Sequence, residues 1–305
     1  MPKISIIIPT YNRAHLLPDA VNSVLNQTYQ NFEIIIVDDC STDNTKEVVG
    51  KFGDKRIKYI RHSKNKGVSA AFNTGIKNST GEYLTIVTDD NMLFPQSLEK
   101  IVNKFKDVPG SNIGVILGGI SYIDEKDNVL KSVLFKERGN IFDSILRDAK
   151  PFFPFFKKEI FKKVGLFDES LSGREDWDLF LRIAKYYQFD FIPELVVKAR
   201  VHQGYHLSSK SRLPLAESNL KVTLRHMDYL QKKPQLLSMK LRTAGNLFCQ
   251  AGDLRRGRAL FLRSTKANPL NLLTYIYFFI SIFGSRFYRK IFRLKDRVLT
   301  GIDFG

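Results

Sequence analysis

Short apolar runs alternate with amphipathic stretches through the first hundred residues. Each run has the length of a strand and few polar interruptions, which is typical of strands buried on both faces of a parallel sheet. The stretches between the runs repeat apolar residues at helical spacing. The pattern predicts strands at 4–8, 32–37, 57–60 and 82–87, and helices at about 13–25, 44–49, 68–76 and 95–105.

Strand–helix alternation with short connections predicts an α/β fold with a doubly wound sheet. Right-handed crossovers place the loops after the first, second and fourth strands on one edge, where open α/β sheets bind their ligands. We therefore expect one binding site built from these loops. The polar clusters in them are Thr10-Tyr11-Asn12-Arg13, Asp38-Asp39 and Thr88-Asp89-Asp90-Asn91.

The pattern changes in the second half of the chain. A further strand is predicted at 114–123 and a helix at 176–184, and beyond about residue 208 the pattern is wholly helical. We therefore predict a first domain over residues 1–208 and a helical C-terminal region over 209–305. The helices expected in that region are 220–230, 236–251 and 254–267.

Positive charge is concentrated near the C-terminus. The chain of 305 residues has a formal net charge of +17. Residues 1–194 hold 27 basic and 26 acidic residues, whereas residues 195–305 hold 21 basic and 5 acidic ones. A basic tail is typical of contact with nucleic acid or with an anionic membrane, and the charge alone leaves both open.

Composition narrows the class of protein. With 43% hydrophobic and 26% charged residues, the chain can bury a core, which excludes general disorder. Its two cysteines are too few for a disulfide framework, and the N-terminus lacks the pattern of a signal peptide. We expect a cytoplasmic protein, with a peripheral position on the cytoplasmic face of the membrane as an extension of that expectation.

An apolar stretch of 14 residues covers 270–283 and is followed by basic residues interleaved with apolar ones up to 297. As a helix it would be about 21 Å long, short of the roughly 30 Å of a bilayer core. This composition favours a helix lying in the interface of an anionic membrane, through residues 270–297. The alternative is a terminal helix packed on the rest of the protein with a solvated basic face.

The order and spacing of several short motifs resemble the family 2 glycosyltransferases from residue 3 to about 205. This resemblance implies a GT-A type doubly wound mixed sheet with a C-terminal helical extension. It also implies an inverting hexosyl- or N-acetylhexosaminyl-transferase that moves a sugar from a nucleotide diphosphate sugar, with a UDP-sugar favoured, to a hydroxyl of a glycan or lipid-linked acceptor. The motifs are Ser-Ile-Ile-Ile-Pro-Thr-Tyr-Asn-Arg at 5–13, Val-Asp-Asp-Cys-Ser-Thr-Asp at 37–43, Asn-Lys-Gly at 65–67, Thr-Asp-Asp-Asn at 88–91 and Glu-Asp-Trp-Asp at 175–178.

The acidic pair after the fourth predicted strand matches the family's metal-binding motif. A divalent ion such as Mn²⁺ or Mg²⁺ takes hard oxygen ligands and neutralises the charge that grows on a leaving diphosphate. The resemblance implies Asp90 as a metal ligand, Asp89 as a ribose or metal partner, and His202 as a further metal or phosphate contact. Thr88 stands where many members carry another Asp. The alternative for the pair is a helix cap ahead of Pro95.

The same resemblance implies a pocket for the donor nucleotide. Asp39 would accept a hydrogen bond from the uracil ring, since a carboxylate can accept from a ring N–H. The alternative at 38–39 is an Asx-type turn. Position 72 is Phe, where many members place an Arg, which puts a donor contact of that Arg in doubt. The other residues implied in donor binding are Pro9, Thr10, Tyr11, Arg13, Lys66, Gly67 and Asn73.

A third acidic cluster matches the family's general base. An inverting transfer needs a base that takes the proton of the acceptor hydroxyl, and the resemblance gives this role to Asp176. Glu175 and Trp177 are implied as acceptor contacts, although Trp177 can equally pack in a core. The alternative for Glu175 and Asp176 is that they only complement the dipole of the following helix.

Two other classes of protein remain open on the sequence. A basic nucleic-acid-binding protein would use the C-terminal helices, although no nucleic-acid-binding motif accompanies the charge. A nucleotide-sugar-binding scaffold without activity would explain Phe72 and Thr88, although the acidic pairs are retained.

Overall fold

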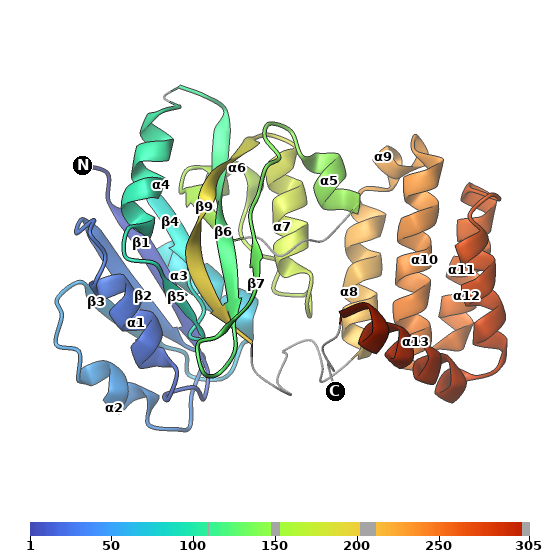
Figure 1. Cartoon of the computed structure of the whole chain (residues 1–305), viewed down its shortest axis with the longest axis horizontal. Helices are drawn as coiled ribbons and strands as arrows, with labels where there is room; N and C mark the ends of the chain where they lie inside the picture. Colours follow the sequence, from blue (N-terminus) through green and yellow to red (C-terminus); the bar gives the residue numbers. More distant parts are fainter. Residues whose placement is uncertain (109, 148–152, 202–211, 301–305) are drawn as a thin grey trace. The chain divides into compact units, whose positions relative to one another are not determined.

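The computed structural model describes residues 1–108, 110–147, 153–201 and 212–300, with side chains up to residue 292 (Figure 1). The chain forms two compact units. The first unit comprises Met1–Glu169 and Leu179–Val201, and the second comprises Ser170–Asp178 and His202–Gly305. The sequence pattern predicts residues 170–178 in the first domain, whereas their contacts place them with the helical C-terminal region.

The first unit is built on a mixed sheet, which confirms the predicted α/β class. Within the described residues the sheet has nine strands in the order β3-β2-β1-β4-β8-β6-β9-β5, and β7 pairs with β6. Strands β1 to β4 run parallel, and β8 lies antiparallel between β4 and β6. The strands are β1 (Ile4–Thr10), β2 (Phe32–Asp38), β3 (Ile57–Arg61), β4 (Tyr83–Ile86), β5 (Asn91–Leu93), β6 (Ile113–Ile123), β7 (Val129–Val133), β8 (Pro154–Lys157) and β9 (Gln188–Arg200).

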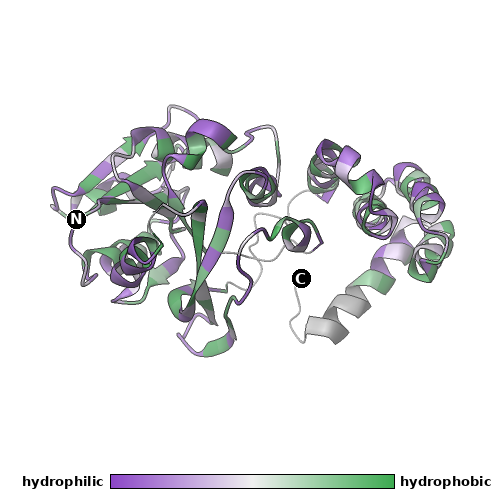
Figure 2. Ribbon diagram, turned by 90° about the horizontal axis from the view of Figure 1, so that it is seen from above, coloured by the Kyte–Doolittle hydropathy of each residue, from purple (hydrophilic) through white to green (hydrophobic). Residues whose placement is uncertain are grey.

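The central parallel strands β1 and β2 form because their apolar runs are buried on both faces, whereas β3 at the end of the sheet is only partly buried. Every residue of β1 is buried, and it pairs in register with β2 from Ile4 opposite Phe32 to Thr10 opposite Asp38. Green, hydrophobic residues accordingly run along strands of the sheet in Figure 2. This pairing brings the polar residues that follow β1 and β2 to the same edge.

Helices connect the strands of the first unit. In α1, Pro18 lies in the first turn, as its missing N–H requires. Helix α4 buries the predicted face of Leu98, Ile101 and Val102 but begins at Ser97 rather than at Pro95. The helices are α1 (Leu17–Leu25), α2 (Thr45–Gly50), α3 (Val68–Asn78), α4 (Ser97–Lys106), α5 (Phe142–Arg147), α6 (Ile160–Val164) and α7 (Glu175–Ala184), whose first four residues belong to the second unit.

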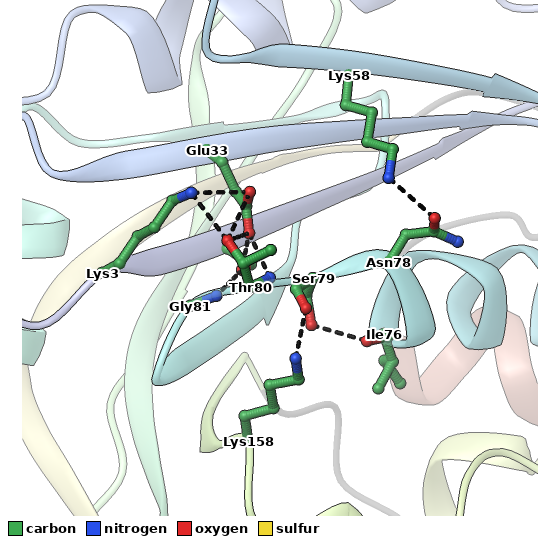
Figure 3. A network of polar contacts seen from close by, with 10 residues as sticks. Lys3, Glu33, Lys58, Ile76, Asn78, Ser79, Thr80, Gly81 and Lys158 are labelled. Carbon is green, nitrogen blue, oxygen red and sulfur yellow. Dashed lines mark hydrogen bonds and ion pairs between the residues drawn. The ribbon is translucent and has the colours of Figure 1, made fainter.

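A polar network at the edge of the sheet opposite the predicted site fastens β1, β2 and the turn before β4 (Figure 3). The Glu33 carboxylate accepts hydrogen bonds from the Ser5 hydroxyl and the Thr80 N–H, each at 2.6 Å. It also forms an ion pair with Lys3 at 3.0 Å. Partial burial opposes ionisation of Glu33, but these hydrogen bonds outweigh it and lower its pKa to about 2.

The second unit confirms the predicted helical extension. Helices α10 and α11 approach closely at Gly245 and Gly257, where a Cβ on either residue would lie 2.9 Å from the other's carbonyl oxygen. Its core includes Leu241, Phe248 and Leu260. The helices are α8 (Arg212–Arg225), α9 (Met227–Gln231), α10 (Pro234–Ala251), α11 (Leu254–Ala267), α12 (Leu272–Ile282) and α13 (Ser285–Thr300).

Candidate active site

The direction of winding reverses beside β1. Strand β2 pairs with one side of β1 and β4 with the other, both parallel to it. A reversal of this kind opens a crevice at the carboxyl ends of the strands, where α/β proteins bind ligands. The loops that meet there are 10–14, 38–44 and 87–91, after β1, β2 and β4 (Figure 1).

The acidic pair after β4 is bridged by the loop after β1. Arg13 Nη1 donates to Asp89 Oδ1 at 3.0 Å and to Asp90 Oδ2 at 2.9 Å. The Thr88 hydroxyl donates to Asp90 Oδ1 at 2.6 Å. The structure therefore brings Arg13, Asp89 and Asp90 into one cluster. Thr88, which replaces an Asp of the family motif, orients Asp90 instead of adding a third carboxylate.

The two carboxylates of the pair differ in environment. Asp89 is 4% exposed, and burial raises its pKa to about 6 although the nearby Arg13 guanidinium opposes that rise. The Asp90 side chain is 20% exposed to solvent. Asp90 is therefore the member of the pair that a ligand in the crevice can reach more readily.

The donor set at this pair suits a divalent cation. Two neighbouring carboxylates already surround one positive charge, the Arg13 guanidinium, and carboxylate oxygens are the ligands that Mg²⁺ and Mn²⁺ prefer. Among the described residues no group of three or more His, Cys, Asp or Glu side chains is gathered for a metal ion. Phosphate oxygens and water would therefore complete the coordination. His202 lies outside the described residues.

Asp39 holds the loop that precedes α3. Its Oδ1 accepts the Lys66 N–H at 2.8 Å and lies 2.7 Å from His62 Nδ1, and its Oδ2 accepts the Gly67 N–H at 2.8 Å. Because a carboxylate offers about four acceptor positions, one on Oδ2 is left among the described residues. Gly67 adopts a φ of +89°, which a side chain would strain.

His62 is a site residue that the sequence pattern did not single out. It is buried after β3, with Nδ1 beside Asp39 and Nε2 2.9 Å from the Thr74 hydroxyl. The signal available in the sequence was its place at the end of β3, the strand next to β2.

Asp38, in contrast, is structural: its carboxylate is fully buried, accepts the Ser41 N–H at 2.7 Å and accepts the Tyr59 hydroxyl. The bond to Ser41 is the Asx-type turn that the sequence offered as an alternative.

The loop after β1 is tied to the loop after β2. Asn12, at a φ of +54°, accepts the Thr42 N–H at 2.7 Å. Pro9 and Thr10 are buried as the last residues of β1, whereas the Tyr11 ring is 44% exposed beside them. An exposed aromatic ring on a fixed loop is suited to stacking on a planar base.

Asn73 uses its side-chain amide inside the first unit. Its Nδ2 donates to the Phe167 carbonyl at 3.0 Å, and its Oδ1 accepts the Phe167 N–H at 2.9 Å. Phe72 packs on the Phe167 ring, with 4.9 Å between ring centroids. Both residues therefore hold the loop at 165–169, and a donor contact of Asn73 stays a prediction.

The third acidic cluster belongs to the second unit. Asp176 is exposed at the start of α7, where its Oδ1 accepts the Trp177 N–H at 2.7 Å. Glu175 has a buried Oε2 that finds no hydrogen-bond partner among the described residues, and burial raises its pKa. Trp177 is 2% exposed and has the Lys240 ammonium 4.6 Å from its ring centroid, so the ring packs in the core. Arg174, just before the helix, has a φ of +73°, which is uncommon for a residue with a side chain.

Comparison with known proteins adds evidence from relatives. Residues 5–165 match the family described as glycosyl transferase family 2. The chain is 36% identical to an uncharacterised glycosyltransferase of Rickettsia typhi over 216 residues, which cover 67% of this chain and 65% of that relative. It is 32% identical to the glycosyltransferase GlyG of Streptococcus pneumoniae over 180 residues, 53% of this chain and 58% of GlyG. The chain thus spans less than two thirds of the length of these relatives.

Solved structures confirm the predicted GT-A fold. The crystal structure of S. aureus TarS 1–349 matches with a TM-score of 0.66 at 20% identity, covering 92% of this chain and 91% of that chain. The same TarS fragment in complex with UDP-GlcNAc also gives a TM-score of 0.66, at 21% identity and with the same coverage. At this level of identity the likeness establishes the fold.

Proposed function

The chain belongs to glycosyl transferase family 2, and on this premise we propose that it transfers a sugar from a UDP-sugar to a hydroxyl of a glycan or lipid-linked acceptor, with inversion and with a divalent cation. The observation that carries the proposal is the Arg13–Asp89–Asp90 cluster at the carboxyl ends of β1 and β4. The UDP-GlcNAc complex of TarS, which has the same fold, supports a uridine nucleotide as the donor.

The donor nucleotide would lie across the loops after β1 and β2. The unused acceptor position on Asp39 Oδ2 suits the ring N–H of uracil, and the exposed Tyr11 ring suits stacking on that base. Lys66 is exposed at the N-terminus of α3, where the helix dipole and its charge would both favour a diphosphate. Asp39 would thus bind the uracil base and also hold the loop that precedes α3.

Asp90, with Asp89 and with His202 as a further proposed contact, would hold Mn²⁺ or Mg²⁺. When bound, such an ion neutralises the negative charge that grows on the departing diphosphate. Arg13 bridges the two carboxylates and would also supply a positive charge near the diphosphate. Thr88 limits rotation of Asp90 through its 2.6 Å hydrogen bond.

Asp176 would act as the general base. Its Oδ1 is fixed by the Trp177 N–H, so that Oδ2 would take the proton of an acceptor hydroxyl, and desolvation raises the pKa of this carboxyl, which makes it a stronger base. The hydroxyl oxygen then attacks the anomeric carbon on the face opposite the nucleotide, and the nucleotide diphosphate leaves. Glu175, beside the base, is the proposed acceptor contact.

A cytoplasmic location is part of the proposal. Cys40 and Cys249 are free thiols, which suits a reducing compartment. In the cytoplasm the protein would have access to the UDP-sugars that we propose as donors.

A screen of nucleotide sugars for metal-dependent hydrolysis tests the proposal without knowledge of the acceptor. We expect one UDP-sugar to be hydrolysed with Mn²⁺ and none with EDTA. The Asp176→Asn variant should lose hydrolysis and transfer but keep its affinity for UDP, whereas Asp228→Asn, at an exposed acid of α9, should behave as wild type. Hydrolysis of no nucleotide sugar, or an Asp176→Asn variant with wild-type turnover, would overturn the assignment.

A further inference from the structure

Helix α12 buries a face that carries three hydroxyl side chains and exposes large apolar side chains on the opposite face. Thr274, Tyr277 and Ser281 share one face and are buried. The opposite face starts an apolar strip with Leu272, Ile276 and Phe279, which Phe283 at the end of α12 and Phe287 of α13 (Ser285–Thr300) continue. Each of the five is between 46% and 72% exposed. A surface helix of a soluble protein normally faces its apolar side chains to the core and its hydroxyl side chains to the solvent, which is the opposite of this arrangement.

Specific contacts hold α12 in this orientation. The Thr274 hydroxyl lies 3.1 Å from the Ser264 hydroxyl of α11, and Arg258 donates to the Ser281 carbonyl at 2.6 Å. The Tyr277 ring packs edge-on against Phe292, with 4.7 Å between centroids. Because the buried polar groups find partners on α11, turning the apolar strip inward would break these bonds. The outward orientation of the apolar strip is therefore fixed by the hydrogen bonds between α12 and α11.

The apolar strip is continuous and continues into α13. Its rings contact one another in sequence, with 5.2 Å between the centroids of Phe279 and Phe283 and 5.4 Å between those of Phe283 and Phe287. Gly284, at a φ of +94°, allows the chain to turn between the two helices. A contiguous exposed patch of this kind marks a surface that binds something apolar.

The charge around the strip identifies its partner. From residue 254 to residue 295 the chain has ten basic residues and no acidic one. Arg286 and Lys290, which flank Phe287 in the sequence, are exposed on α13. A second copy of the chain would bring positive charges together at such a surface, which is unfavourable. An anionic lipid bilayer offers acyl chains for the apolar side chains and negative head groups for the basic ones.

We propose that the apolar strip and the basic residues of α13 bind the surface of an anionic lipid bilayer. Helix α12 has 11 residues and is about 16 Å long, shorter than a bilayer core of roughly 30 Å. In the described part of the chain no helix is long and apolar enough to cross a membrane. The helix therefore lies in the interface with Phe279 and Phe283 among the acyl chains and the basic side chains at the head groups. This inference does not depend on the proposed function.

Flotation with lipid vesicles tests the proposal on the full chain. The wild type should float with phosphatidylcholine vesicles that contain phosphatidylglycerol and only weakly with phosphatidylcholine alone. Phe279→Ser/Phe283→Ser should abolish flotation, and Arg286→Gln/Lys290→Gln should weaken partitioning roughly 30-fold, since each basic residue near an anionic surface contributes about 1 kcal/mol.

Matched control variants in the first unit keep the test specific. Val129→Ser/Leu130→Ser removes two exposed apolar side chains of β7, and Lys55→Gln/Lys64→Gln removes two exposed charges, so both should float as wild type. Circular dichroism checks that every variant is folded. A wild type that stays unbound, or strip variants that float as well as wild type, would overturn the proposal. A dimer in sedimentation that Phe279→Ser/Phe283→Ser converts to a monomer would overturn it in favour of a second copy.

Discussion

Two acidic pairs end parallel strands at the same edge of the sheet, but they use their carboxylates differently. Asp38 and Asp39 after β2 accept backbone N–H groups from Ser41, Lys66 and Gly67, in addition to their side-chain contacts with Tyr59 and His62. Asp89 and Asp90 after β4 accept from the side chains of Arg13 and Thr88. A backbone donor is fixed by the fold, whereas a side chain can rotate and give way to a ligand.

The difference separates residues that fasten the loops of the candidate site from residues that we propose to act in it. Two Asp-Asp dipeptides after buried strands look alike in a sequence. Their partner atoms show that the first pair fastens the loops after β2 and β3, whereas the second pair is held by the side chains of Arg13 and Thr88. Binding of a cation and a diphosphate is the role that we propose for the second pair. Changing each pair should therefore affect different measurements.

The largest effect is expected from Asp90→Asn. Loss of the negative charge should lower kcat for metal-dependent hydrolysis of the donor by about 10²–10³-fold, as for removal of one electrostatic group at a reacting centre. The amide can still accept from Thr88, so the free energy of unfolding should change by less than about 1 kcal/mol. Kinetic assays and urea unfolding measure the two quantities, with Glu47→Gln, at an exposed acid of α2, as the control. Unchanged kcat would place Asp90 with the structural residues.

Asp38→Ala should act on stability. It leaves the Tyr59 hydroxyl and the Ser41 N–H without their buried partner, which should cost about 2–4 kcal/mol of the free energy of unfolding. The midpoint of urea unfolding reports the loss. A variant as stable as wild type would show that backbone-bound carboxylates of this edge are dispensable for the fold.

Asp39→Asn should give a smaller loss that affects both properties. An amide cannot accept on both atoms, so one of the bonds to Lys66 and Gly67 is lost, at a cost of about 1–2 kcal/mol in stability. UDP should also bind more weakly, because the position left for the uracil N–H lies on the same group. Calorimetry with UDP would contradict the shared role if affinity were unchanged.

A last effect concerns Glu33, at the other edge, which accepts from the side chains of Lys3, Ser5 and Thr80 as well as from the Thr80 N–H. Its pKa is lowered from 4.5 to about 2 in the folded protein. Because the folded pKa lies below the unfolded one, the carboxylate stabilises the fold above about pH 4.5, and this contribution is lost as the pH falls towards about 2. Urea unfolding in this range should be less pH-dependent for Glu33→Gln than for wild type. Equal pH dependence would show that the network contributes nothing.

The parts of the fold that were predictable are those whose local pattern agrees with their surroundings. Strands β1 and β2 are largely apolar runs, and α11 was predicted with the bounds that it has. Strands β5 and β7 were missed because each depends on a distant partner: three residues of β5 pair with Val197–Ala199, and β7 is largely exposed beside β6.

The site was predictable to the level of residue type and strand end. Arg13, Asp89 and Asp90 cluster, but the use of Asn73 to hold Phe167 and the place of His62 beside Asp39 depend on contacts across more than ten residues. The apolar stretch at 270–283 was visible in the sequence, whereas the orientation of α12 was not, because the hydroxyl groups that fix it find their partners on α11.

Titration calorimetry of UDP with and without Mn²⁺, on wild type and on Asp90→Asn, is the most direct test of the role given to the pair after β4. Mn²⁺ should raise the affinity of the wild type at least about tenfold, a gain of about 1.4 kcal/mol, and should leave that of Asp90→Asn unchanged. An equal gain in both proteins, or none in the wild type, would contradict it.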